Sequence, residues 1–130
     1  MSTLYMPPAP EVNEETAACW DATNHGRLLL RRCKSTGKAF HPPRTLSPFT
    51  GLNDTDWIEA SGRGVVYSFS VSSRQGPPHC IAYVTLQEGP TLLSCLVDCD
   101  PAAVFIGQPV HVVFVASSTG QRVPMFTPDA

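Results

Sequence analysis

The stretch RLLLRRCKSTGKAFHPPRTLSPFT, residues 27–50, decides the fold. Its apolar start leads into one turn at residues 33–37, CKSTG, and a second turn follows at residues 47–51, SPFTG. Both turns have the same layout, which is a residue, two spacers, a second residue and a glycine. Cysteine at all four flanking positions would give the paired C-x-x-C knuckles that hold zinc in a ribbon. The spacing therefore predicts a zinc-ribbon hairpin.

The residues at the four positions do not match a zinc site. Cys33 is the only cysteine among them, and hydroxyl groups, which are poor zinc ligands when neutral, stand at Thr36, Ser47 and Thr50. We therefore expect four vestigial ligand positions in a metal-free hairpin, with the three hydroxyls bonding the backbone of the turns. Three aromatic side chains are expected to pack the hairpin: Phe40, Phe49 and Trp57.

The other cysteines are not expected to rebuild the site. Cys95 and Cys99 are four residues apart on one predicted strand, which separates them by about 13 Å, whereas zinc–sulfur bonds are about 2.3 Å long. Cys33 and His41 together would supply only two ligands. The thiol of Cys33 lies beside two basic residues, which could lower its pKa and make it reactive, but we favour a leftover ligand.

The bulk composition bounds the class of protein. The 130 residues are about one domain's length of chain, and 42% of them are hydrophobic. The net charge of −2 argues against binding nucleic acid or an anionic membrane. No run reaches the ~20 apolar residues of a membrane span, and residues 1–10 lack the pattern of a signal peptide. Five cysteines without a dense pattern favour a cytoplasmic protein.

A short helix is predicted over residues 13–24, before the hairpin. Asn13 can cap its first turn and Gly26 can end it in a left-handed conformation. Trp20 lies on its modest apolar face. Two interpretations of Trp20 stay open: it anchors the helix on the body, or it belongs to a ligand or partner surface. A strand is predicted next, at residues 27–32.

From residue 62 onward the pattern becomes all-β. Strands are predicted at residues 64–73, 80–87, 91–99, 110–117 and 122–126. In the first of them Tyr67 and Phe69 share an apolar face with two valines, and we expect that face in the core. Pro124 predicts that the last is an edge strand. The longer connection after the third strand has room for one helical turn, and five such strands suit an OB-type barrel.

The predicted architecture is therefore mainly β and has three parts. Residues 1–26 form an N-terminal extension with the short helix, and residues 27–60 form the degenerate zinc ribbon. Trp57 is expected to plug the ribbon's interior. Residues 61–130 form the five-stranded barrel.

Seven motifs occur in a fixed order along the chain: GRLLLRRCKSTG at 26–37, HPPR at 41–44, SPFTG at 47–51, SGRGVVYSF at 61–69, AYVTLQEGP at 82–90, IGQPVHVVF at 106–114 and PMFTP at 124–128. This series resembles a family of bacterial and archaeal proteins that combine an N-terminal helix, a rubredoxin-like zinc ribbon and a C-terminal OB-fold. It is the acyl-CoA-associated domain of unknown function numbered thirty-five. The chain departs from the family at the three missing ligands and at Cys19, where the family usually has phenylalanine.

The resemblance implies a partner rather than a reaction. Members accompany thiolase-like enzymes, including aldolases of steroid side-chain breakdown, or MaoC-type hydratases, in hetero-oligomeric complexes that act on acyl-CoA thioesters. Our first hypothesis is a non-catalytic accessory subunit of a thiolase-superfamily enzyme. A CoA-thioester-binding partner of a MaoC-type enoyl-CoA hydratase is the first alternative. A single-stranded nucleic-acid-binding OB protein is the second.

Binding residues are predicted mainly in the ribbon half. Basic residues gather there, and a basic patch could meet the phosphates of CoA or an acidic partner, although a solvated face is an equally good interpretation. The candidate binding residues for CoA or a partner are Trp20, Arg27, Arg31, Arg32 and Arg44. No catalytic residue and no metal site are predicted, and an acyl-CoA is the one ligand that the resemblance implies. The excess of acidic over basic residues argues against non-specific binding of nucleic acid.

Overall fold

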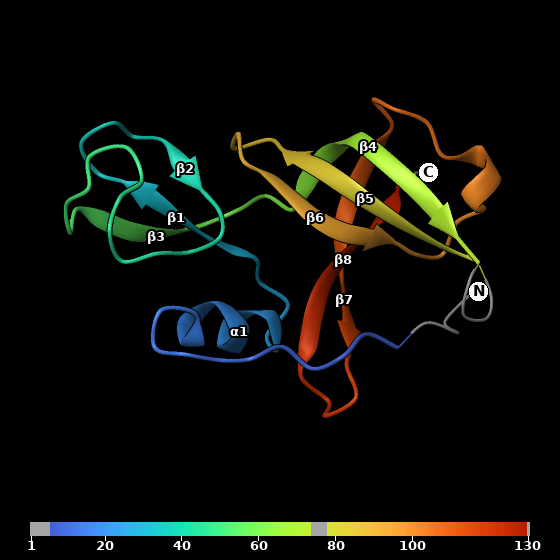
Figure 1. The fold of residues 1–130 in the computed structure, drawn as a ribbon, viewed down its shortest axis with the longest axis horizontal. Coiled ribbons are helices and arrows are strands. Elements are labelled where there is room, and N and C mark those ends of the chain that lie inside the picture. Colours follow the sequence, from blue (N-terminus) through green and yellow to red (C-terminus); the bar gives the residue numbers. More distant parts are fainter. Residues whose placement is uncertain (1–5, 74–77, 130) are drawn as a thin grey trace.

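The computed structural model describes residues 6–73 and 78–129. A three-stranded sheet lies at one end of the molecule, a closed five-stranded barrel lies at the other, and helix α1 lies beside both (Figure 1). The helix packs on a strand of each, β1 (Leu29–Cys33) and β8 (Arg122–Pro128). Neither α1 nor the single 3₁₀ turn of the described chain is long enough to cross a membrane.

Helix α1 (Ala17–Thr23) is one turn shorter at its start than the predicted span of 13–24. The side-chain oxygen of Asn13 accepts hydrogen bonds from the backbone N–H groups of Glu15 and Thr16, at 2.9 and 3.1 Å. This Asx turn competes with the first helical turn, so the helix begins after it. The helix ends as predicted, because Gly26 adopts a left-handed conformation with φ of +73°.

The ribbon sheet has the order β2-β1-β3 and is antiparallel throughout, with β2 spanning Ala39–Phe40 and β3 spanning Thr55–Glu59. Strand β1 starts two residues later than predicted and includes Cys33. The prediction that Trp57 plugs the interior is wrong. Its neighbour Ile58 faces the core, opposite fully buried Leu30, and strand alternation turns Trp57 to the other face. There its ring stacks under the guanidinium of Arg31, 4.3 Å from the ring centroid.

The barrel has the strand order β4-β5-β6-β8-β7 and closes between β4 and β7. Its remaining strands are β4 (Arg63–Ser72), β5 (His79–Leu86), β6 (Thr91–Leu96) and β7 (Pro109–Ala116). Only the β6–β8 pairing is parallel. The predicted OB-type barrel is thereby confirmed, and so is the helical turn between the third and fourth strands, η1 (Pro101–Ala103).

Ribbon and barrel share one hydrophobic core. Strand β5 alternates, and its buried side chains Cys80, Ala82 and Val84 line the inside of the barrel. Leu28 and Leu30, from the start of the ribbon, belong to the same buried cluster. The two parts are therefore packed against each other.

The prediction that Tyr67 and Phe69 lie in the core is wrong. Tyr67 is 64% exposed and Phe69 is 37% exposed, whereas Val66 is buried. A β-bulge between Val66 and Ser68 shifts the register, so the simple alternation read from the sequence fails there. Phe69 then lies opposite buried Ala82 but stays partly exposed, because β7 pairs with β4 only along its first three residues.

Strand β8 is not the edge strand that Pro124 predicted. It lies between β6 and β7 and pairs with β7 along its whole length. Its pairing with β6 is limited to Leu96 and Phe126, so the missing N–H of Pro124 has little effect on the hydrogen bonding between β6 and β8. The hydroxyl of Ser94 on β6 donates to the Pro124 carbonyl instead, at 3.0 Å.

The prediction that Cys95 and Cys99 share a strand is also wrong. Strand β6 ends at Leu96, and Asp98 turns the chain with a positive φ of 53°. Both thiols instead lie close enough to Cys80 to influence it. Burial, with smaller effects of Cys99 and Cys95, raises the pKa of Cys80 to about 11. Among the described residues no group of acidic, histidine or cysteine side chains could hold a metal ion.

Candidate functional site

The two turns of the ribbon have the same backbone geometry. The N–H of Gly37 donates to the Cys33 carbonyl and the N–H of Gly51 donates to the Ser47 carbonyl, both at 2.8 Å. Both glycines are left-handed, with φ of 73° and 74°. Cys33 and Ser47 are fully or almost fully buried. The structure therefore brings two matching knuckles together around the first residue of each.

Hydroxyl groups hold these knuckles, as the sequence predicted. The Ser47 hydroxyl accepts from the backbone N–H groups of Phe49 and Thr50, at 3.1 and 3.3 Å. The hydroxyls of Thr36 and Thr50 accept one backbone N–H each. The rings of Phe40 and Phe49 meet edge to face, with centroids 6.2 Å apart. Because these oxygens are used by the backbone and Cys33 is the one thiol, the donor set does not fit zinc.

The thiol of Cys33 has a lowered pKa, which the sequence analysis considered but did not favour, and its cause differs from the one considered there. Hydrogen bonds from the side chains of Ser47 and Thr36 lower it, rather than the neighbouring basic residues. The side chain is completely buried. A buried thiol cannot reach a solvent-borne substrate, so the geometry fits a structural role.

The structure separates the predicted basic patch into pieces. The Nε atom of Arg27 lies 2.9 Å from the Oε1 atom of Glu59, and both side chains of this ion pair are exposed to solvent. Arg32 pairs with Asp56 through two hydrogen bonds, at 3.2 and 2.7 Å. Both guanidinium groups therefore already have a carboxylate.

Arg31 and Arg44 are the two predicted binding residues that lie together. The Nε of Arg31 donates to the Arg44 carbonyl at 3.2 Å. Glu15 lies nearby and accepts the N–H of Thr45 at 2.7 Å. That hydrogen bond lowers the pKa of Glu15, and the charges of Arg44 and Arg31 add to the effect. The two guanidinium groups of Arg31 and Arg44 therefore give this part of the surface a positive charge, which the carboxylate of Glu15 partly offsets.

The Arg32–Asp56 pair should make stability depend on pH. Its hydrogen bonds hold the pKa of Asp56 below the ordinary 3.8, so its stabilising effect is present at neutral pH and is lost as the pH falls through that lowered value. We expect Asp56→Asn to unfold at lower urea concentration than the wild type at pH 7. The difference should shrink toward zero near pH 2. A difference that stayed constant between these pH values would contradict this account of Asp56.

An exposed apolar patch covers the outer face of the barrel, and we call it the barrel patch: Tyr67, Ile81, Tyr83 and Leu93. Ile81 and Tyr83 share one face of β5, and Leu93 on β6 lies directly opposite Tyr83. Tyr67 lies at the bulge of β4, beside the residue that pairs with Tyr83. Strands β4, β5 and β6 lie side by side there (Figure 1) and contain one charged residue, Arg63. The sequence analysis missed this patch, although the near absence of charge was a usable signal.

The barrel patch supplies only half of a nucleic-acid-binding surface. Its tyrosines are exposed and could stack on bases. The second requirement is a basic groove, and the described outer strands provide one arginine, at their beginning. The patch is therefore better suited to an uncharged protein surface.

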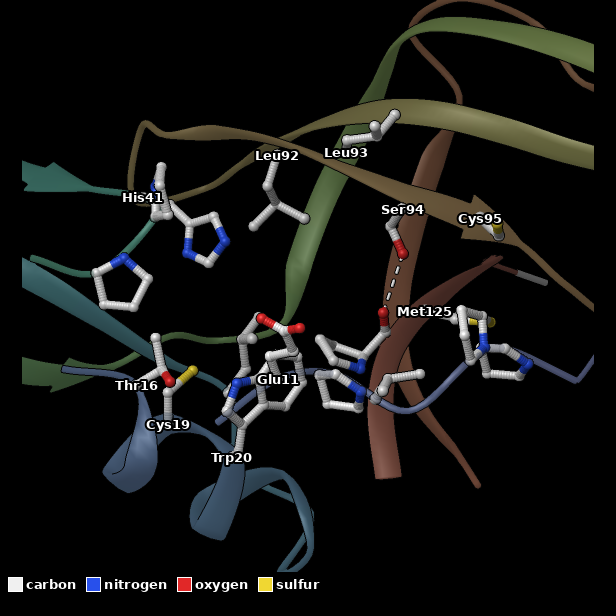
Figure 2. Close-up of a pocket in the computed structure, with 18 residues that line it drawn as sticks. Glu11, Thr16, Cys19, Trp20, His41, Leu92, Leu93, Ser94, Cys95 and Met125 are labelled. Carbon is white, nitrogen blue, oxygen red and sulfur yellow. Dashed lines mark hydrogen bonds between the residues drawn. The ribbon is translucent and has the colours of Figure 1, made fainter. Parts of the chain in front are cut away.

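A pocket of about 410 Å³ opens where helix, ribbon and barrel meet. Figure 2 shows Trp20 rising from α1 toward β6, with Leu92 reaching down from β6 and His41 at one side. Most of the lining is apolar, including several prolines and the sulfur atoms of Cys19 and Met125. The structure thus places Trp20 in a cavity, apart from the paired arginines Arg27 and Arg32. Sequence reasoning missed the cavity, because its walls come from distant segments.

Two family models match the chain. One is described as the rubredoxin-like zinc ribbon domain of ChsH2 and matches residues 20–46. The other is described as the C-terminal OB-fold domain of ChsH2 and matches residues 57–115. Together they cover the first part of the predicted ribbon and most of the barrel, and residues 47–56 lie between the two matches.

Three similar proteins show the breadth of the likeness. A "DUF35 domain-containing scaffold protein" of Methanothermobacter thermautotrophicus is 32% identical over 108 residues, covering 77% of this chain and 81% of that protein. A "Probable enoyl-CoA hydratase alpha subunit" of Thermomonospora curvata is 34% identical over 93% of this chain, which spans only 40% of the subunit's length. A solved structure titled "Ltp2-ChsH2(DUF35) aldolase" superposes with a TM-score of 0.82 at 32% identity, covering 92% and 98% of the two chains.

Proposed function

Because the chain belongs to the DUF35 family, with its ChsH2-type zinc ribbon and OB-fold, we propose that it is a non-catalytic accessory subunit of a thiolase-superfamily acyl-CoA enzyme. The likeness to the chain in the Ltp2–ChsH2 aldolase structure supports such a partner, since it extends over nearly all of both chains. The subunit stabilises the partner enzyme as one component of a hetero-oligomer.

The barrel patch is the observation that carries this proposal. Leu93 is 58% exposed and Tyr83 is 47% exposed, although they are directly opposed on adjacent strands. Aromatic and aliphatic side chains without charged neighbours are typical of the buried centre of a protein interface. A partner that covers the patch would remove this apolar surface from water.

The thiol chemistry also supports a non-catalytic role. Burial raises the pKa of four of the five cysteines, which keeps these thiols protonated: Cys19, Cys80, Cys95 and Cys99. Cys33, the fifth, is out of reach of solvent. All five are free thiols, and we infer a reducing cytoplasm as their compartment.

Co-purification tests the proposal. The tagged chain is co-expressed with the thiolase-superfamily enzyme encoded beside it, and the eluate is analysed by size-exclusion chromatography with light scattering. We expect one hetero-oligomeric peak in a fixed ratio of subunits. We also expect a higher melting temperature for the enzyme in the complex, because association stabilises the folded state. A chain that elutes alone at all concentrations tested would contradict the proposal.

A CoA-thioester-binding partner of a MaoC-type hydratase is the second candidate. It is favoured by the 34% identity to the hydratase alpha subunit and by the adjacent Arg31 and Arg44. Guanidinium groups bind phosphate oxygens well. Replacing both by glutamine should weaken CoA binding and reduce its dependence on salt, whereas Arg27→Gln, which removes an arginine already paired with Glu59, should change neither. Unchanged affinity in the double variant would count against this candidate.

A further inference from the structure

The pocket between α1 and β6 is a cavity formed by several elements of the fold, rather than a shallow depression in the surface. Its floor and walls come from separated parts of the chain, which include the proline-rich segment before α1, the turn after β2, strand β6 and strand β8. Trp20 lies across it from Leu92, and Cys19 borders it from the same helix (Figure 2). Proline walls, fixed in φ, give the cavity a preformed shape.

The size of the cavity suits a medium-sized ligand. Small-molecule sites range from roughly 300 to 1,000 Å³, and the volume here is about 410 Å³. An apolar cavity of about 150 Å³ holds one benzene ring. The cavity therefore has room for roughly two to three times that amount of hydrocarbon.

The polar groups of the lining favour an uncharged ligand. The Ser94 hydroxyl already donates to the Pro124 carbonyl, and the Thr16 hydroxyl is bonded to Asn13. Burial, together with the charge of Arg44, lowers the pKa of His41, so its ring is neutral at pH 7. The one carboxylate among the lining residues is that of Glu11, which would repel an anion. Free fatty acids are thereby disfavoured, whereas an esterified acyl chain is not.

We propose that this pocket holds the hydrocarbon part of an acyl thioester, about ten carbons long or longer. The choice of a thioester rests on the proposed function, because it is the neutral acyl derivative that an acyl-CoA enzyme handles. The pocket borders the barrel patch at Leu93, which belongs to both, so the accessory subunit would contact substrate next to the surface proposed to dock the enzyme.

Tryptophan fluorescence of the full chain tests the site without any partner. The chain has two tryptophans, so Trp57→Phe leaves Trp20 as the single reporter. In that background we titrate decanoyl-CoA, 1-decanol, decanoate and CoA. Decanoyl-CoA and decanol should change the Trp20 emission saturably, decanoate should bind at least ten-fold more weakly than decanol, and CoA alone should give no change. No saturable change with either decanoyl-CoA or decanol overturns the proposal, and so does a response to CoA alone.

Pocket-filling variants sharpen the test. Cys19→Phe and Thr16→Phe add a ring from the α1 side of the cavity, and each should weaken decanol binding at least ten-fold. Cys19→Ser, which keeps the size of the side chain, is the matched control and should bind like the parent. Equal affinities in all variants with unchanged melting temperatures would overturn the site. Because no partner is present, this failure is distinct from a failure of co-purification, which bears on the proposed function.

Discussion

Replacing Thr36, Ser47 and Thr50 by cysteine is expected to turn the ribbon into a zinc site. The two knuckles already have matching geometry, with Gly37 and Gly51 in the same left-handed conformation. The side chains of Ser47 and Thr36 already contact the thiol of Cys33. The variant therefore adds only the missing thiolates to a backbone that suits tetrahedral coordination.

The effect on stability should be large and should differ in sign with and without metal. Without zinc the variant should be less stable than the wild type, because the Ser47 hydroxyl loses two backbone hydrogen bonds, each worth about 1 kcal/mol. With zinc at 1,000 times Kd, binding adds roughly 4 kcal/mol. For a chain of this size that raises the melting temperature by on the order of 10 °C.

Melting curves recorded with zinc and with a chelator measure this change in stability. The absorption spectrum of the cobalt-loaded variant reports tetrahedral thiolate ligands directly. The wild type should melt at the same temperature in both solutions, since we propose that its ribbon folds without metal. Adding Cys33→Ser to the triple variant removes the fourth thiolate and should abolish the zinc-dependent gain. Stoichiometric zinc in the purified wild type would contradict the metal-free ribbon.

Local patterns were enough to predict the ribbon and the approximate positions of the barrel strands along the chain. The two Gly-terminated turns have the same geometry because the residue spacing before each glycine is the same. The hydroxyls bond the backbone as their chemistry predicts. These features depend on neighbours within a few residues, which sequence reasoning handles well.

The errors arose where distant strands decide the outcome. Tyr67 and Phe69 alternate as core residues do, but a bulge and the short reach of β7 along β4 leave both exposed. Trp57 has the size of a core residue, but its partner strand places Ile58 inside instead. The pocket beside Trp20 is assembled from segments as far apart in the chain as Pro7 and Met125. Its existence depends on how ribbon and barrel pack, which no local pattern encodes.

Charging the barrel patch should separate the chain from its enzyme without unfolding it. The double variant Tyr83→Lys with Leu93→Glu places opposite charges directly across β5 and β6, an arrangement that stabilises a strand pair rather than weakening it. The net charge is unchanged. Because both side chains are already exposed in the isolated chain, we expect its melting temperature to stay within a few degrees of the wild type.

In the complex the same charges would be buried against an apolar surface. Removing charged groups from water without new partners costs several kcal/mol, and about 3 kcal/mol already weakens association more than 100-fold. The complex should therefore be lost from co-purification, and the control Leu52→Glu, which charges a 62%-exposed leucine on the ribbon, should retain it. Loss of the complex in the control but not in the double variant would place the interface on the ribbon instead of the barrel. That result would contradict the role of the barrel patch in the proposed function.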